Sequence, residues 1–339
     1  MVRHQRRAFP VWALWLGLGA FVGLAAALVV PFLIPVPRPE GLVDAEDLAD
    51  EDSCFIDIDG VRVHYKDEGD AGDRQTVVFL HGFASSLYSW RHAMAALKAS
   101  RRVIAFDRPG FGLSGRPLPG DWEGESPYTL HSSACETVAL MDALGVEQAV
   151  LVGHSQGASI AVLVADACPE RVSGLVLVNA PTASPRFQAR PYLEWIRSIP
   201  QLRHIAPLVP RPFFGRNAKR IMSMAYADPH RLADETVALE LKATRVKDWD
   251  LSYVELTRSQ AGLHFPEAMA RIGVPTLVVA GRKDRTVPYR DQQLAATSIP
   301  GARFMTFYDT GHVVPEERPG AFDEVLEDFL EELDPPIGA

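Results

Sequence analysis

Cysteine is scarce in this sequence of 339 residues. Its three cysteines, Cys54, Cys135 and Cys168, are widely spaced and form neither a C-x-x-C pair nor a Cys/His cluster. A small, odd number of widely spaced cysteines argues against a disulfide framework and against a structural zinc site. Cys135 and Cys168 fall in segments predicted to be helical, where we expect buried and unreactive thiols.

Positive charge is also in short supply, because 34 Lys and Arg residues face 43 Asp and Glu residues, which gives a net charge of −9. No basic stripe is visible in the body of the chain. The composition therefore offers no general attraction to nucleic acid, and none is expected as a partner. Hydrophobic residues make up 47% and charged residues 23% of the chain, as in ordinary globular proteins.

Charge is absent altogether from residues 11–34. A helix of that length spans roughly 36 Å, enough to cross the hydrocarbon core of a bilayer. The run is longer than the apolar core of about 7 to 15 residues in a cleaved signal peptide, so an uncleaved transmembrane anchor is favoured. A cleaved signal peptide and a buried helix remain the alternatives. Residues 1–10 carry three arginines, which predicts a cytoplasmic N-terminus and an extracytoplasmic body.

The rest of the chain divides into a linker, a core and an insertion. Residues 35–53 are rich in Pro and acidic side chains, which predicts a linker without a fixed structure. Residues 54–181 and 272–339 alternate apolar runs with helix-forming stretches. Residues 182–271 contain no clear strand and many Pro and aromatic residues, so we expect an inserted helical cap.

The alternation in the core indicates βαβ units and a mostly parallel sheet with helices on both faces. Such a sheet is expected because the strand-like runs are almost wholly apolar. The predicted strands are residues 55–58, 61–65, 77–80, 103–106, 149–152, 175–178, 276–280 and 303–307. The predicted helices are residues 90–99, 130–144, 155–167, 290–298 and 322–333.

The strongest local motif is Gly-His-Ser-Gln-Gly at residues 153–157, which fits the pattern G-x-S-x-G. It lies between the predicted strand 149–152 and a helix-forming stretch, the context of a nucleophile elbow. Such an elbow exposes a serine hydroxyl on a sharp, strained turn at the end of a strand. The sequence therefore predicts Ser155 as a nucleophile.

Two further side chains follow predicted strands in the order that a serine triad requires on this fold. Asp284 follows the strand 276–280, and His312 follows the strand 303–307. His312 would accept the proton of the serine, and Asp284 would orient its imidazole ring. Asp309 is a competing acid three residues before His312, but we interpret it as a turn residue.

The oxyanion of a tetrahedral intermediate needs two backbone donors. We expect them to be the N–H of Gln156, at the start of a helix, and the N–H of Phe83, in the loop after strand 77–80. His81 and His154 are interpreted as structural residues. Residues 107–114, Asp-Arg-Pro-Gly-Phe-Gly-Leu-Ser, are interpreted as a tight supporting loop, because two glycines alone are a weak phosphate-loop signal.

Taken together and in order, these motifs resemble the α/β-hydrolase superfamily over residues 55–333. They are HGF at 81–83, DRPGFGLS at 107–114, GHSQG at 153–157, GRKD at 281–284 and GH at 311–312. The resemblance is to the capped serine esterase and lipase branch, and the anchor makes the chain similar to membrane-bound monoacylglycerol lipases. It implies an eight-stranded sheet, a triad of Ser155, Asp284 and His312, and an oxyanion hole at Phe83 and Gln156.

The residue at the elbow separates members of that superfamily. Dehalogenases and epoxide hydrolases have an aspartate there, whereas Ser155 implies acyl transfer to a hydroxyl. The acid that some relatives place after the sixth strand is missing here, because Asn179 follows that strand. No metal or organic cofactor is implied.

The leading hypothesis is a carboxylesterase or lipase that takes a small-molecule or lipid ester with an apolar acyl group. Two alternatives stay open. The same triad could act on thioesters, amides or C–C bonds or transfer an acyl group to an alcohol, and the scaffold could be a non-catalytic binding subunit.

Overall fold

The computed structural model describes residues 11–70, 72–182, 199–259 and 265–334. The predicted basic N-terminus, two stretches of the predicted cap and the last five residues lie outside the described residues, at 1–10, 183–198, 260–264 and 335–339.

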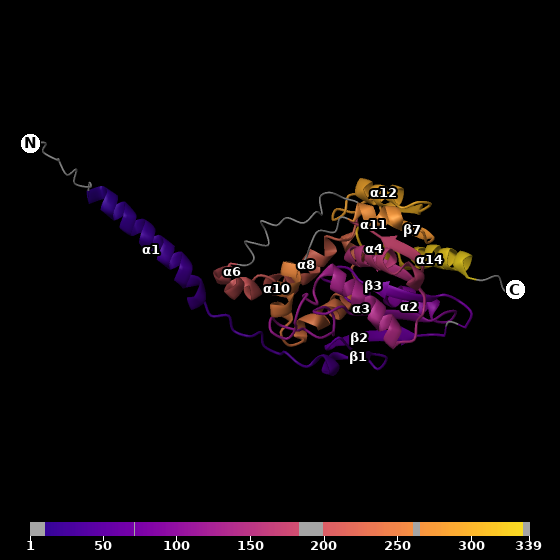
Figure 1. The fold of residues 1–339 in the computed structure, drawn as a ribbon, viewed down its shortest axis with the longest axis horizontal. Coiled ribbons are helices and arrows are strands. Elements are labelled where there is room, and N and C mark those ends of the chain that lie inside the picture. Colours follow the sequence, from indigo (N-terminus) through magenta and orange to yellow (C-terminus); the bar gives the residue numbers. More distant parts are fainter. Residues whose placement is uncertain (1–10, 71, 183–198, 260–264, 335–339) are drawn as a thin grey trace, which may run out of the picture.

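Eight strands form a single sheet in the order β1-β2-β4-β3-β5-β6-β7-β8 (Figure 1). Strand β2 pairs antiparallel with β1 and β4, and every other neighbouring pair is parallel. The strands are β1 (Cys54–Ile58), β2 (Val61–Glu68), β3 (Thr76–Leu80), β4 (Val103–Phe106), β5 (Ala149–His154), β6 (Val172–Val178), β7 (Thr276–Gly281) and β8 (Arg303–Phe307). The predicted fold class, an α/β-hydrolase fold with an eight-stranded, mostly parallel sheet, is confirmed.

Helices cover both faces of the sheet, as its apolar strands require. Alternate residues of β5 show the division, since Leu151 packs into the apolar cluster under one set of helices and Val152 into the cluster under the other. The first set comprises α3 (Leu130–Ala143), α4 (Gln156–Ala167), α11 (Pro266–Arg271) and α12 (Tyr289–Ser298). The second set comprises α2 (Arg91–Leu97), α13 (Val314–Glu317) and α14 (Pro319–Leu333), with the 3-10 helix η2 (Leu87–Trp90).

The described part of the segment between β6 and β7 is helical, as expected, and contributes no strand to the sheet. Its α-helices before α11 are α6 (Pro200–Ile205), α7 (Arg211–Phe214), α8 (Ala218–Ser223), α9 (Asp234–Leu241) and α10 (Trp249–Ser259). Its 3-10 helices are η5 (Ala206–Leu208), η6 (Pro229–Arg231) and η7 (Lys242–Arg245). We call this insertion the cap.

A long helix, α1 (Val11–Leu33), precedes the body and projects away from it (Figure 1). It is long and apolar enough to cross a membrane, and most of its apolar side chains among residues 15–33 are exposed. An anchor and a signal sequence share these properties.

Two expectations about local structure are wrong. Cys135 is exposed and Cys168 is only half-buried, because α3 turns Ala134 and Thr137 rather than Cys135 toward the core. The linker is also ordered in its second half. Val43 forms a bridge with Val246, and the 3-10 helix η1 (Ala45–Leu48) follows.

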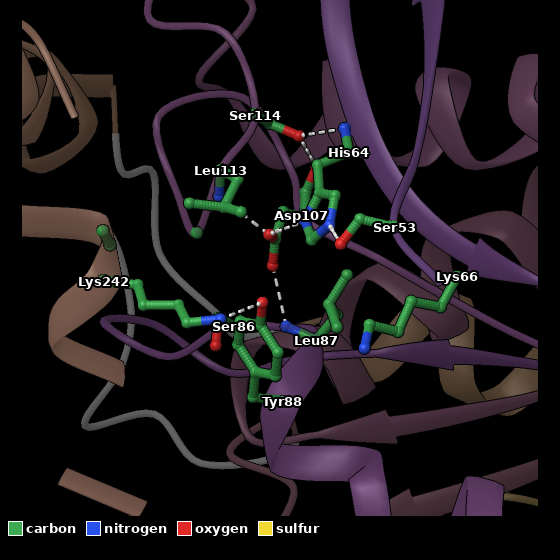
Figure 2. Close-up of polar contacts among 12 residues, drawn as sticks. Ser53, His64, Lys66, Ser86, Leu87, Tyr88, Asp107, Leu113, Ser114 and Lys242 are labelled. Carbon is green, nitrogen blue, oxygen red and sulfur yellow. Dashed lines mark hydrogen bonds and ion pairs between the residues drawn. The ribbon is translucent and has the colours of Figure 1, made fainter. Parts of the chain in front are cut away.

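The ordered linker is fixed to the body by Asp50. Its carboxylate accepts hydrogen bonds from Tyr88 Oη at 2.7 Å and Lys66 Nζ at 3.2 Å, and it also pairs with Lys242 of the cap. Figure 2 shows Lys242 of the cap beside Tyr88, whose hydroxyl accepts a hydrogen bond from Lys242 Nζ at 3.1 Å. Partial burial would raise the pKa of Asp50, but the hydrogen bonds from Lys242, Tyr88 and Lys66 outweigh it and lower the pKa to about 2. Asp50 thus joins the linker, the core and the cap.

We expect Asp50→Asn to lower the free energy of unfolding at pH 7 by about 1 kcal/mol, after discounting for the partial exposure of the carboxylate. The depressed pKa means that this stabilisation is present above about pH 4, the ordinary range for Asp, and is lost as the pH falls through about 2. Urea unfolding measures the difference. Asp52→Asn is the matched control, because Asp52 contacts the same Lys66 at 2.6 Å but is half-exposed. An equal loss in both variants would contradict a specific role for Asp50.

Candidate active site

Ser155 occupies a strained turn between β5 and α4. Its φ of 51° and ψ of −113° lie outside the regions that most residues with a Cβ adopt. The flanking glycines are required by close packing. A Cβ on Gly153 would lie 2.4 Å from the carbonyl oxygen of Gly157, and one on Gly157 would lie 2.1 Å from that of Leu80. The motif thus holds the serine hydroxyl out of the regular strand and helix.

The structure brings the three predicted triad side chains together from the ends of three strands. His312 Nε2 lies 3.0 Å from Ser155 Oγ, and His312 Nδ1 lies 2.8 Å from Asp284 Oδ2. Asp309 is exposed and pairs with Lys283 at 2.7 Å, so it is not the partner of the imidazole. The arrangement allows a proton to move from the hydroxyl to the imidazole while the carboxylate stabilises the resulting charge.

Asp284 is held in its ionised form. Burial would raise its pKa, but the hydrogen bond from His312 and the backbone N–H groups of Val287 and Thr286 outweigh burial and lower the pKa. Those two N–H groups donate to Asp284 Oδ1 at 2.9 and 2.8 Å.

Two amide side chains complete the surroundings of this carboxylate. Asn179 Nδ2 and Gln292 Nε2 each donate to Asp284 Oδ2 at 2.9 Å. Asn179 follows β6, at a position that the sequence marks only by the absence of an acid. Its amide donates a hydrogen bond to Asp284, which follows the neighbouring strand β7.

The loop after β3 passes beside the nucleophile. A Cβ on Gly82 would lie 2.9 Å from His154 Nδ1 and 3.4 Å from Ser155 Cβ, so only glycine fits comfortably there. Phe83 follows it and lines the same cavity as Ser155. Gln156 begins α4 directly after the serine, and its Oε1 accepts from Arg108 Nη1 at 2.8 Å. The two proposed oxyanion-hole residues therefore flank the nucleophile.

His81 and His154 support the backbone around the site. His81 Nδ1 donates to the carbonyl of Gly82 at 2.7 Å, and His154 Nε2 donates to that of His312 at 2.7 Å. Burial, followed by the positive charge of Arg108 for His81 and of His312 for His154, lowers the pKa of each ring to about 3. Both rings are therefore neutral near pH 7.

The loop 107–114 is a supporting element. Asp107 is fully buried, and its carboxylate accepts the N–H groups of Leu87 at 2.7 Å and Leu113 at 2.9 Å (Figure 2). A Cβ on Gly112 would lie 1.8 Å from Asp107 Oδ2, so a side chain there would displace the carboxylate. This finding matches the interpretation of the loop as structural.

A second Ser-His-Asp arrangement surrounds the same aspartate, and sequence reasoning missed it. His64 Nδ1 lies 2.7 Å from Asp107 Oδ2, and His64 Nε2 lies 2.8 Å from Ser53 Oγ (Figure 2). Ser53 Oγ also accepts the N–H of Asp50 at 3.0 Å, and Ser53 does not line the cavity that holds Ser155. This group therefore ties the linker to the core, and no motif in the sequence marks it.

A cavity of about 310 Å³ contains Ser155 and His312 in its wall. Most of its other wall residues are apolar or aromatic, and eight of these come from the cap, among them Phe213, Phe214, Ile221, Met222 and Tyr253. Its ionisable wall residues apart from the histidines and tyrosines are Glu240 and Glu316, and no Lys or Arg of the described chain lines it. The cavity suits an apolar group and disfavours an anion.

Glu240 also lines this cavity, and no pattern in the sequence indicated that it would. Its Oε1 accepts from Ser85 Oγ at 3.1 Å. Burial and the nearby Glu316 carboxylate raise the pKa of Glu240 to about 8, so it is uncharged at neutral pH. Glu316 itself pairs with Arg91. Among the described residues, no group of three or more His, Cys, Asp or Glu side chains could hold a metal ion.

Comparison with known proteins agrees with the fold. Residues 75–319 match the family described as alpha/beta hydrolase fold. The uncharacterized hydrolase YugF of Bacillus subtilis (strain 168) is 30% identical over 286 residues, covering 80% of this chain and 96% of that protein. The 2-hydroxy-6-oxononadienedioate/2-hydroxy-6-oxononatrienedioate hydrolase of Paraburkholderia phymatum (strain DSM 17167 / CIP 108236 / LMG 21445 / STM815) is 31% identical, covering 80% and 91%. A solved membrane phospholipase A superposes with a TM-score of 0.66 at 20% identity, covering 95% of this chain and 96% of that one.

The chain belongs to the α/β-hydrolase fold family, and it is a serine hydrolase of that fold. Its relatives include hydrolases of different bonds, so membership alone does not define the substrate.

We expect Asn179→Ala to slow labelling of the protein by a fluorophosphonate probe by about tenfold, because Asp284 loses one donor to its charged form. Asp309→Ala is the control and should label at the parent rate, because that carboxylate contacts only Lys283 among the described residues. If Asp309→Ala were the slower variant, the orienting acid would have to be reassigned.

Proposed function

We propose that this chain is a membrane-anchored serine hydrolase that cleaves carboxylic esters of apolar acyl substrates. The observation that carries the proposal is the imidazole of His312 placed between Ser155 Oγ and Asp284, in the wall of an apolar cavity.

In this proposal Ser155 Oγ attacks the ester carbonyl while His312 Nε2 takes the hydroxyl proton. The N–H groups of Phe83 and Gln156 stabilise the tetrahedral oxyanion. His312 then gives the proton to the departing alcohol, which leaves an acyl group on Ser155. Water, deprotonated by the same ring, repeats the attack and releases the acid. Asp284 stabilises the imidazolium in both halves of the reaction.

The cavity wall favours an uncharged apolar substrate. Hydrolysis of a C–C bond is the second candidate, and its test substrates are dioates, because a relative at 31% identity is named as a hydrolase of two dioates. A dioate carries two carboxylates at neutral pH. At neutral pH Glu240 is uncharged and Glu316 pairs with Arg91, and no Lys or Arg of the described chain lines the cavity. The mostly apolar wall therefore offers nothing that would compensate the charge of a dianion. We therefore place ester hydrolysis first.

We further propose that α1 anchors the protein, with the N-terminus in the cytoplasm and the catalytic body on the other side. The exposed apolar surface of α1 and the three arginines among residues 1–10 support this orientation. Protease added to intact cells with a permeable outer surface should digest the body. Digestion only after lysis would reverse the orientation.

We expect Ser155→Ala to abolish labelling by a fluorophosphonate and to lower kcat for p-nitrophenyl esters by several orders of magnitude. Esters of increasing acyl length, followed by monoacylglycerols and a dioate C–C substrate, would define the substrate class. Thermal unfolding should show that the variant stays folded. A parent protein that neither labels nor turns over any of these substrates would refute the proposal.

The pKa of Glu240 gives the substrate preference a pH dependence. Below about pH 8 the carboxyl is protonated and neutral, and above it a negative charge faces the cavity. We expect KM for an apolar ester to rise as the pH increases through 8, because the charge would have to be desolvated by the bound acyl group. Glu240→Gln keeps the shape without the charge, so its KM should stay level. The same rise in both proteins would assign the effect to another group.

A further inference from the structure

One stretch of the cap differs in charge from the rest of this acidic chain. Residues 199–227 contain no Asp or Glu, although the net charge of the whole chain is −9. Their five basic side chains are Arg203, Arg211, Arg216, Lys219 and Arg220. The expectation that the body carries no basic stripe is therefore wrong for this stretch, which we call the basic cap face.

Part of this positive charge is uncompensated. Arg203, Arg211 and Lys219 pair with carboxylates of later cap residues. Arg216 and Arg220 are exposed, and neither has an ion-pair partner among the described residues. The face therefore exposes two guanidinium groups, of Arg216 and Arg220, that pair with no carboxylate of the described chain.

The same face exposes large apolar side chains. Leu202 is 41% exposed, Phe213 51%, Val209 61% and Met224 63%. Elsewhere in the described body beyond Ile34, the comparably exposed large hydrophobic side chains are Leu294, Met305 and Tyr308. Apolar side chains beside free basic ones are typical of segments that lie in the interfacial region of a bilayer.

The basic cap face is continuous with the end of α1 (Figure 1). Gln201 Nε2 donates to the carbonyl of Leu28 at 3.3 Å, and His204 Nε2 donates to that of Ile34 at 3.0 Å. The ring of His204 also lies 5.6 Å from that of Phe32. Helix α6 therefore lies alongside the last turns of the apolar helix.

The contact with α1 sets the depth of α6 relative to a bilayer. A helix of 23 residues spans about 34 Å, only slightly more than the roughly 30 Å of hydrocarbon that it would cross. Leu28 precedes the end of α1 by five residues, or about 7 Å. Wherever α1 spans a membrane, α6 must then lie at the boundary between acyl chains and lipid headgroups.

We propose that the basic cap face docks on the anionic lipid surface of the membrane that α1 crosses. The proposal rests on the proposed anchoring and is independent of which bond the enzyme cleaves. Arg216 and Arg220 would contact anionic headgroups, and Leu202, Val209 and Phe213 would enter the interface. Phe213 also lines the cavity that holds Ser155, so docking places one wall of that cavity against the lipid. Substrates that partition into the bilayer would enter there.

Hydrogen exchange on the full-length chain, incorporated as one copy per lipid nanodisc, tests the docking directly. We expect peptides from residues 199–227 to exchange more slowly in discs of phosphatidylglycerol than in discs of phosphatidylcholine. Peptides from α12 and β8 should not change between the discs. Since a basic residue near an anionic surface contributes about a fivefold preference, Arg216→Glu with Arg220→Glu should reduce the added protection by about 25-fold or more.

The matched control is Arg290→Glu with Arg303→Glu, which makes the same charge change on α12 and β8. This control should keep the lipid-dependent protection. Exchange that is identical in both lipids, or equally weakened by both double variants, would overturn the proposal. Protection that requires two copies per disc would assign the face to a second copy of the chain and would overturn it as well.

Two further measurements distinguish the docking proposal from the proposed ester hydrolysis and from the proposed membrane anchoring. The Arg216→Glu and Arg220→Glu protein should hydrolyse a water-soluble short ester at the parent rate and an ester dissolved in anionic bilayers about tenfold more slowly. Loss of both activities would refute selective docking. Failure of the parent on the soluble ester would refute the proposed chemistry alone. Extraction of the parent from membranes by sodium carbonate would refute the anchoring.

Discussion

The close approach of α4 to β3 is the constraint on which the active site depends. Gly157 lies so near the carbonyl of Leu80 that any larger residue would force helix and strand apart. That packing fixes the turn at Ser155 and brings the loop carrying Phe83 beside it. Asp284 follows β7 and His312 follows β8, so these strand ends place a carboxylate and an imidazole beside a serine hydroxyl whose position is already fixed. The backbone strain at Ser155 is sustained by the packed core below it.

The charged carboxylates around the site are stabilised by hydrogen bonds from the protein rather than by water. Asp107 and Asp284 are buried, and each carboxylate is held by backbone N–H groups and one imidazole. The two aspartates therefore have the same kind of environment but different purposes, since one orients a ring beside a cavity and the other fixes a loop. Solvent access distinguishes them, because a triad without a cavity has no room for a substrate.

Sequence patterns predicted the sheet well, because strands that are covered on both faces consist of continuous apolar runs. The observed strands extend the predicted runs by only a few residues. The elbow and the two residues after β7 and β8 were also predictable, since glycine spacing and strand ends constrain them. The roles of Asn179, Glu240 and His64 were not. Each depends on which elements the fold brings together, and no local period records that. The net charge of the whole chain likewise did not reveal the basic cap face, because acidic residues elsewhere outnumber its basic ones.

The ordered half of the linker limits how far the body can move from α1. Only the residues between Ile34 and Val43 are free of the contacts that begin with the Val43 bridge, and they extend to about 30 Å at most. With α1 in a bilayer, such a short tether confines catalysis to a thin layer above one leaflet. Substrates dissolved in that leaflet are then met at a high effective concentration by diffusion in two dimensions, whereas molecules in bulk water gain nothing.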